Sequence, residues 1–381
     1  MTKLTPVSDP VVHGKRVSWA ELFFDLVFVF AITQLSGLLH DDHGWSGVGR
    51  AVVVFLPIYW VWVGTTMQTN RRDLDRPMER VALFFVALCG LMMALAVPEA
   101  YGERGILFAA AYWAARLGFG VFAFHGHLRQ VQPFTVSMVF TGPLLLVGAL
   151  LDGTTREIVW LVAALIDLAM PSLLRGRLST MRFDAGHLTE RFGLFVLIAI
   201  GESIVATGAP AASPNAVVNV ATLVAVTAAF LLCCGLWWVY FHFANDAMRH
   251  ALATARVQLT ITRHVLSYGH VVFIAAIVAI AVGMEETVAH PDHHLTWSVL
   301  GLLYGGAALF LAAFGYTRWM MFRLVSTTRL AAALCVLALI PLAHLVPALA
   351  ATLMLAAALI TLNLVEHRRV ARAARSTATS G

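Results

Sequence analysis

Charged residues are scarce in this sequence of 381 residues. Asp, Glu, Lys and Arg together make up 12% of the chain, whereas hydrophobic residues make up 60%. Soluble globular domains carry about 25% charged residues, so this composition excludes a soluble protein of this size. The sequence therefore predicts an integral membrane protein that has the lipid bilayer as its main partner.

Cysteine is also rare, and several catalytic motifs are missing. The sequence contains no P-loop, no dinucleotide fingerprint, no GxSxG and no HExxH, which argues against ATP-driven transport and standard hydrolase chemistry. His264 and His270 are six residues apart, which is not the spacing of a helical chelate. We predict no metal and no cofactor. No CxxC pair exists among the four cysteines, which all lie in apolar runs and predict no disulfide framework: Cys89, Cys233, Cys234 and Cys335.

The basic residues are unevenly distributed along the chain. All but four of the 26 Lys and Arg residues fall before the first apolar run, in alternate loops or in the tail. Arg50, Arg104 and Arg156 lie on the opposite side, and Arg116 lies inside a run. This bias follows the positive-inside rule and predicts a multi-pass protein of the bacterial plasma membrane with both termini in the cytoplasm. The net charge of +5 therefore reports topology, and we predict no nucleic-acid partner.

Twelve apolar runs are long enough to be membrane spans, since about 20 apolar residues cross the hydrocarbon core. The predicted fold class is all-α, a polytopic bundle of about twelve transmembrane helices. The predicted spans are 18–40, 47–68, 79–98, 104–125, 133–151, 156–174, 189–208, 216–242, 263–284, 295–316, 329–346 and 348–365.

The first and seventh runs resemble each other. Glu190 aligns with Glu21 and Phe192 with Phe23, at an offset of 169 residues. Because six spans precede the second motif, the two halves are predicted to be parallel six-helix repeats. The predicted division is a cytoplasmic segment 1–17, a first half 18–174, a cytoplasmic loop 175–188, a second half 189–366 and an Arg-rich cytoplasmic tail 367–381.

Carboxylates occur inside both of these runs. Glu21 and Asp25 are four residues apart and so share one helix face, and Glu190 and Glu202 lie in the seventh run. An ionised carboxylate at membrane depth costs about 2.5 to 3.5 kcal/mol, so such residues face a bundle interior or a wet cavity. We predict a polar path or binding site near the first and seventh helices. The alternative is that these carboxylates only cap or pair with neighbouring helices.

Three further polar residues lie within predicted spans. Arg116 is expected to form an ion pair with Asp25 or Asp167, because an unpaired Arg at that depth is unfavourable, and such a pair fits a structural role as well as a functional one. His270 is interpreted as a hydrogen-bonded packing residue or as part of a proton relay. Five aromatic residues are candidates for a cavity wall, with ordinary helix packing as the alternative: Trp60, Trp62, Trp237, Trp238 and Tyr240.

The motif Glu21-Leu-Phe-Phe-Asp-Leu-Val-Phe-Val-Phe-Ala31, followed by Glu190-Arg-Phe-Gly-Leu-Phe and Gly201-Glu202-Ser203, resembles the bacterial low temperature requirement protein A (LtrA) family. The resemblance covers the chain from Arg16 to the last apolar run. It implies a polytopic membrane protein linked to growth in the cold, and it implies no particular substrate.

A more distant similarity is to the endolysosomal and bacterial potassium channels built from six-helix repeats. Phe23 and Asp25 match the Phe-Ser-Asp signature of their first helix. This similarity implies a pore between the first and seventh helices, with Ile32 and Ile200 as a hydrophobic constriction. The family's Arg is replaced by Trp19 here, and Leu194 stands where the second repeat would carry its Asp.

Three classes of function fit these features. The first is a channel or transporter for a small cation or another small solute. The second is an intramembrane enzyme that acts on a lipid or isoprenoid by acid catalysis, with Asp25 and Glu202 as the acids. The third is a membrane scaffold or stress sensor without turnover. The sequence leans against an enzyme and leaves the oligomeric state open.

Overall fold

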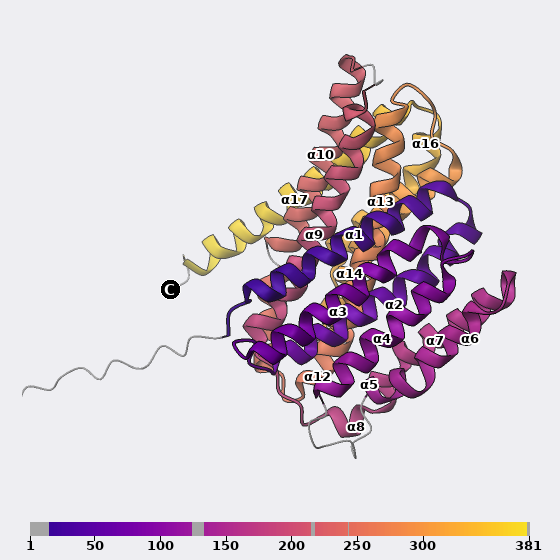
Figure 1. The fold of residues 1–381 in the computed structure, drawn as a ribbon. Coiled ribbons are helices and arrows are strands. Elements are labelled where there is room, and N and C mark those ends of the chain that lie inside the picture. The colour runs from indigo at the N-terminus through magenta and orange to yellow at the C-terminus, as the bar shows by residue number, and fades with distance from the viewer. Residues whose placement is uncertain (1–14, 124–132, 215–217, 243, 379–381) are drawn as a thin grey trace, which may run out of the picture.

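A computed structural model describes residues 15–123, 133–214, 218–242 and 244–378, and helices dominate these segments (Figure 1). No β-strand occurs in the described segments, where the one extended pairing is an isolated bridge between His294 and Pro347. The predicted all-α class is therefore correct for this part of the chain.

The first half of the chain folds into helices that follow the first six predicted spans. The fifth span is broken into a short helix, a π-helical turn and a second helix. The elements are α1 (Trp19–Asp41), α2 (Trp45–Asn70), α3 (Pro77–Ala96), the 3₁₀ turn η1 (Val97–Glu99), α4 (Gly105–Ala123), α5 (Pro133–Val136), the π-helical η2 (Ser137–Thr141), α6 (Gly142–Ala149), α7 (Gly153–Leu173) and α8 (Arg175–Leu178).

The second half follows the remaining six spans and adds two helices, α11 and the one-turn α12, between the predicted spans 216–242 and 263–284. Pro341 interrupts the eleventh span, which divides into α15 and α16 because proline removes a backbone donor. The elements are α9 (Ala185–Ala212), α10 (Val220–Phe241), α11 (Ala244–Thr254), α12 (Gln258–Ile261), the π-helical η3 (Thr262–Gly269), α13 (His270–Ala289), α14 (Trp297–Phe322), α15 (Thr327–Ala338), α16 (Ile340–His344) and α17 (Ala348–Ala378).

Nine helices in the described residues are long and apolar enough to cross a membrane, judged by length and composition. They do not include α4, the α5–α6 segment or α7, which occupy the other three predicted spans. The chain is thus a membrane protein with several apolar helices, and the count of twelve spans stays a prediction.

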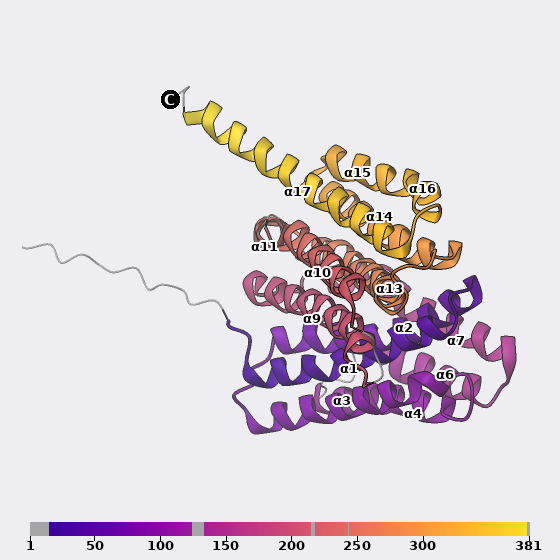
Figure 2. The ribbon, with the colours of Figure 1, turned by 90° about the horizontal axis from the view of Figure 1, so that it is seen from above.

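The two halves show a similar pattern of helix contacts. In the first half α1 packs against α2 and α3, α3 against α4, and α2 against α7. In the second half α9 packs against α10 and α13, α13 against α14, and α10 against α17. Two related halves would show the same pattern of helix contacts. The six-helix repeat itself stays a prediction. The halves meet through α1, α2, α9 and α13, which lie side by side near the middle of the bundle (Figure 2).

Both α1 and α9 begin at a side chain that caps the helix. The Ser18 hydroxyl accepts a hydrogen bond from the Glu21 amide, and the Glu21 carboxylate accepts one from the Ser18 amide, which forms a capping box. The Asp184 carboxylate accepts from the His187 amide at the start of α9. Counted from these caps, Glu21 and His187 hold the same helical position, and so do Asp25 and Arg191.

Candidate functional site

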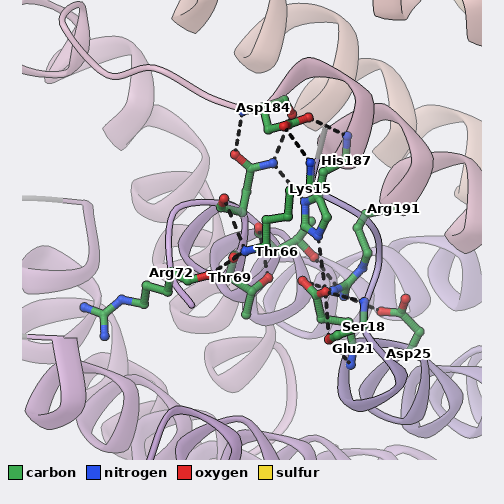
Figure 3. Close-up of polar contacts among 11 residues, drawn as sticks. Lys15, Ser18, Glu21, Asp25, Thr66, Thr69, Arg72, Asp184, His187 and Arg191 are labelled. Carbon is green, nitrogen blue, oxygen red and sulfur yellow. Dashed lines mark hydrogen bonds and ion pairs between the residues drawn. The ribbon is translucent and has the colours of Figure 1, made fainter. Parts of the chain in front are cut away.

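A cluster of buried polar side chains joins the beginnings of α1 and α9 to the end of α2 (Figure 3). The α1 members are Glu21 and Asp25, and the α9 members are His187 and Arg191. All four side chains are fully or almost fully buried, with at most 1% of any of them exposed. We call these four residues the ion cluster.

Arg191 connects the two carboxylates of α1. Its Nη1 lies 2.8 Å from Glu21 Oε1, and its Nη2 donates a hydrogen bond of 2.6 Å to Asp25 Oδ1. The guanidinium also lies 5.9 Å from the ring centre of Phe24 and 6.0 Å from that of Trp62. One cation therefore holds two carboxylates in a site lined by aromatic rings, where electrostatic interactions are stronger than in water.

Trp62 on α2 holds the carboxylate of Asp25 from the other side. Its indole Nε1 donates a hydrogen bond of 2.7 Å to Asp25 Oδ1. The indole stacks on Phe195 of α9, with ring centres 4.1 Å apart, and meets Phe192 edge-on at 5.0 Å. The second oxygen, Asp25 Oδ2, is buried and has no hydrogen-bond partner among the described residues. This oxygen can still accept a proton or contact a cation.

The hydrogen bonds of Asn70 determine the tautomer of His187. Asn70 Oδ1 accepts from the Asp184 amide, so its Nδ2 is the donor that reaches the Asp184 carbonyl and His187 Nδ1, at 3.0 and 2.9 Å. Nδ1 must therefore accept, and the ring proton lies on Nε2, which donates to Glu21 Oε2 at 3.2 Å. His187 is a neutral imidazole in this arrangement.

Lys15 closes the cluster at the end where α1 begins. Its amine donates to three carbonyls at the end of α2, those of Thr69, Asn70 and Arg72, and its backbone amide donates to Asp184 at 3.1 Å. Carbonyls at a helix C-terminus carry partial negative charge and favour a cation. Burial lowers the pKa of the Lys15 amine, and the carboxylates of Glu21, Asp73 and Asp184 oppose that shift.

The ion cluster carries an excess of negative charge. Glu21 and Asp25 contribute two carboxylates, Arg191 contributes one cation, and His187 is neutral, which leaves one negative charge in a site closed to solvent. Lys15 and Asp184 at the margin add one charge of each sign, and the Lys15 amine is attracted to Glu21 as well as to Asp184. A buried unbalanced charge is unfavourable, so binding of a proton or a monovalent cation would stabilise the cluster.

A polar pocket of about 450 Å³ lies beside the cluster. Lys15, Ser18 and Asn70 line it, and each of them also contacts the cluster or its capping residues. The remaining lining residues are Arg16 and the segment 71–75, which follows α2. Solvent in this pocket therefore contacts residues, such as Ser18, that are themselves hydrogen-bonded to a buried carboxylate.

A second buried ion pair lies within the first half, between α4 and α7. Asp167 accepts hydrogen bonds from the hydroxyls of Ser137, Thr141 and Tyr112, and Arg116 Nη2 lies 3.5 Å from its Oδ2. Ser137 and Thr141 are the ends of the π-helical turn η2, which points both hydroxyls at the same carboxylate. Arg116 thus pairs with Asp167, not with Asp25.

Comparison with known proteins supports a family assignment. The family described as bacterial low temperature requirement A protein (LtrA) matches residues 16–364. The chain belongs to the LtrA family. It is 33% identical over 321 residues to a protein of Rhizobium meliloti (strain 1021) described as uncharacterized protein RA0937, which covers 80% of this chain and 77% of that relative. No solved structure matches the chain.

The ion cluster of this LtrA family protein includes two of the four carboxylates that were predicted to form a path. Glu190 is exposed although it adjoins Arg191. Glu202 is buried, but it lies eleven residues beyond Arg191, which is about 16 Å along α9. Its Oε1 has no hydrogen-bond partner among the described residues. The structure therefore brings Glu21 and Asp25 together and leaves Glu202 as a separate polar position.

The other predicted site residues lie apart from the cluster. His270 is buried, with Nδ1 3.0 Å from the Val265 carbonyl and Nε2 2.6 Å from the Tyr240 hydroxyl, so Nδ1 donates and Nε2 accepts. Trp60 is buried and stacks on Tyr268. It lines a small cavity of about 90 Å³ together with Arg71, Arg116 and Arg263. Trp237 and Trp238 are each 41% exposed on α10, and neither lines the polar pocket beside the cluster or the cavity at Trp60.

The sequence analysis missed Arg191 and His187, the partners of Glu21 and Asp25. It counted Arg191 among the loop charges that indicate topology and gave His187 no role. A signal was present, because His187 and Arg191 are four residues apart, as Glu21 and Asp25 are. When one helix carries two acidic residues four positions apart and its neighbour carries two basic residues at the same spacing, both acidic residues can contact a basic one at the same time.

Proposed function

We propose that this LtrA family protein moves a small monovalent cation across the membrane and that the ion cluster is the site at which this charge binds. The cation is a proton or an ion of similar charge that compensates the extra carboxylate. α1 and α9 supply the binding groups, and the polar pocket beside Lys15 supplies access from one side.

The observation that carries this proposal is the charge imbalance of a site that is shut from solvent. A structural ion pair needs one carboxylate for one cation, whereas Arg191 has two carboxylates within 2.8 Å. Asp25 Oδ2 also has no hydrogen-bond partner among the described residues. Ionisable groups at membrane depth are unfavourable unless they are paired, and they mark ion pathways and proton relays in transporters.

In this proposal the structure corresponds to a closed conformation of the site. Glu21, Asp25 and Arg191 have no contact with solvent, so a cation reaches them only after the beginnings of α1 and α9 separate. Phe24, Trp62 and Phe195 surround the carboxylates and exclude water in the closed state. In the proposed cycle, a cation that binds after this separation weakens the attraction of Arg191 for Asp25 and keeps the two helix beginnings apart.

The location and biological setting of the activity belong to the same proposal. The basic loops and the Lys15 pocket would face the cytoplasm of a bacterial plasma membrane, as the positive-inside rule predicts. A role in growth at low temperature, which the family description suggests, would then follow from altered ion balance in the cold.

The proposal is tested by ion flux into liposomes that contain the purified protein. Wild type should carry protons, sodium or potassium down an imposed gradient, and Asp25→Asn should lower this flux about tenfold or more, because it removes the charge that binds the cation. Empty liposomes set the background.

Glu190→Gln is the matched control. It removes a carboxylate from the same turn of α9 that carries Arg191, but Glu190 is exposed and outside the cluster. Its flux should equal that of wild type. An inactive wild type, or equal losses in Asp25→Asn and Glu190→Gln, would contradict the proposal.

A further inference from the structure

An apolar pocket of about 580 Å³ lies between α1, α2, α13 and α14, away from the ion cluster. Its volume is typical of small-molecule sites, which span about 300 to 1,000 Å³ and are lined mainly by hydrophobic side chains. Asp25 and Glu202 are not among the residues that line it. The pocket therefore fits a binding role, without the acids that the enzyme hypothesis requires.

The polar residues of the pocket gather at one end. His43, Trp45, Trp297 and Ser298 lie at or just before the beginnings of α2 and α14, whereas the deeper lining is apolar and reaches Leu309. The thirteen residues from Trp297 to Leu309 span about 18 Å of helix. Trp45 and Trp297 are exposed, as tryptophans at a membrane interface usually are. The pocket is thus an elongated apolar groove with polar residues at one end, and it is open along its side, where Gly301, Val52 and Leu309 are exposed.

Two glycines form an open part of the wall. A Cβ atom added at Gly301 or Gly305 would meet nothing within 4 Å, although both residues line the pocket on α14. By contrast, a Cβ at Gly306 would lie 3.0 Å from the Ala276 carbonyl of α13. Gly301 and Gly305 therefore leave space that helix packing does not use.

One polar atom at the mouth lacks a partner. Nε2 of His43 is buried and has no hydrogen bond within the described part of the chain, while its ring meets that of His40 edge-on at 5.4 Å. The lining residues include neither Lys nor Arg, and carboxylates are nearby, since Asp42 adjoins His43 and Glu285 lies 3.8 Å from His40. The mouth therefore disfavours an anionic group, and a small turn of the His43 ring would expose the buried Nε2 to a neutral hydrogen-bonding one.

We infer that this pocket binds a single-chain lipid with a neutral hydroxyl head, of the monoacylglycerol type, taken up from the surrounding bilayer. The hydroxyl bonds to His43 Nε2 at the mouth, and the hydrocarbon chain extends past Gly301 and Gly305 toward Leu309. Transfer of an acyl chain from the bilayer into an apolar pocket has little hydrophobic driving force, because both surroundings are apolar. Selectivity therefore comes from the shape of the pocket and from the hydrogen bond to the head.

The test is photolabelling of the full-length purified protein with a monoacylglycerol that carries a diazirine in its chain. Wild type should be labelled on the peptides that contain residues 45–55 and 297–309. Gly305→Leu fills the pocket and should reduce this labelling about fivefold or more. The control is Gly37→Leu, an equally unobstructed glycine on the exposed face of α1, which should be labelled as wild type is.

Several outcomes would overturn the inference. Labelling that Gly305→Leu leaves unchanged, or that Gly37→Leu reduces as strongly, would show contact with the general surface and not with the pocket. The elution volume and melting temperature of Gly305→Leu must match those of wild type, and Gly301→Leu replaces it if they do not. Equal labelling by the fatty acid with the same chain, which is anionic at neutral pH, would overturn the assignment of a neutral head.

Discussion

Arg191 is the residue on which the ion cluster depends, because it is the one cation in contact with both Glu21 and Asp25 in the described structure. Neutralising Asp25 would still leave Arg191 paired with Glu21. Removing Arg191 would leave two buried carboxylates that only His187, Trp62 and the Ser18 cap contact. The two substitutions should therefore have very different effects on stability.

We predict that Arg191→Gln lowers the free energy of unfolding by about 3 to 5 kcal/mol, the usual effect of removing one partner from a buried ion pair. Asp25→Asn should change it much less, because the cluster then becomes electrically balanced. Adding Asp25→Asn to Arg191→Gln should recover part of the loss, as a double-mutant cycle measured by unfolding in detergent would show. Additive effects of the two substitutions would mean that the residues are not coupled.

The carboxylates could be recognised from the sequence at the scale of single residues, and their partners could not. An acidic residue inside an apolar run is conspicuous because few charged residues occur there. Arg191 lies at a helix beginning next to basic loops, where the positive-inside rule already accounts for a basic residue. Arg191 is buried between the helices and contacts both carboxylates, which only the structure shows.

At the scale of elements, the cluster is a junction of helix ends. Lys15 precedes α1, donates to the carbonyls at the end of α2 and contacts the cap of α9 through Asp184. The Ser18 and Asp184 caps then fix where α1 and α9 begin. Because these ends meet at one place, movement of any one of them disturbs the other two.

The lowered pKa of Lys15 predicts a pH dependence of stability. Between its folded pKa and the ordinary value of 10.5, the folded chain binds fewer protons at this position than the unfolded chain. The free energy of unfolding contributed by Lys15 therefore rises with pH across that window. The difference in melting temperature between wild type and Lys15→Met should shift in favour of wild type as the pH rises toward 10.5. A constant difference, or a shift in favour of the variant, would contradict this expectation.

Helix positions were largely predictable, and their irregularities were not. Apolar runs gave the first span as 18–40, and α1 covers Trp19–Asp41. The π-helical turns η2 and η3 have no comparable signal, because tertiary contacts select them. The amphipathic helix α11 has a periodic pattern of its own, but it lies outside the apolar runs from which the spans were predicted. Ser137 and Thr141, for example, occupy η2 where their hydroxyls reach Asp167.

At the scale of the whole molecule, the composition decided the class and the packing decided the arrangement. A hydrophobic content of 60% requires a membrane protein, and the described helices agree with that. The alignment of Glu21 with Glu190 drew attention to α1 and α9, which are among the helices that meet in the middle of the bundle. The capping residues give a different register, in which Glu21 corresponds to His187 and Asp25 to Arg191.

The central claim is that the cluster binds a transported cation and is more than a structural lock between the halves. The most direct test is the ion flux of the neutral pair Asp25→Asn with Arg191→Gln in liposomes, measured beside wild type. We predict a folded protein without flux, because Asp25 supplies the carboxylate that binds the cation, whereas Glu21 keeps its hydrogen bonds to His187 and Ser18. Flux equal to that of wild type would show that the ion cluster only holds α1 and α9 together.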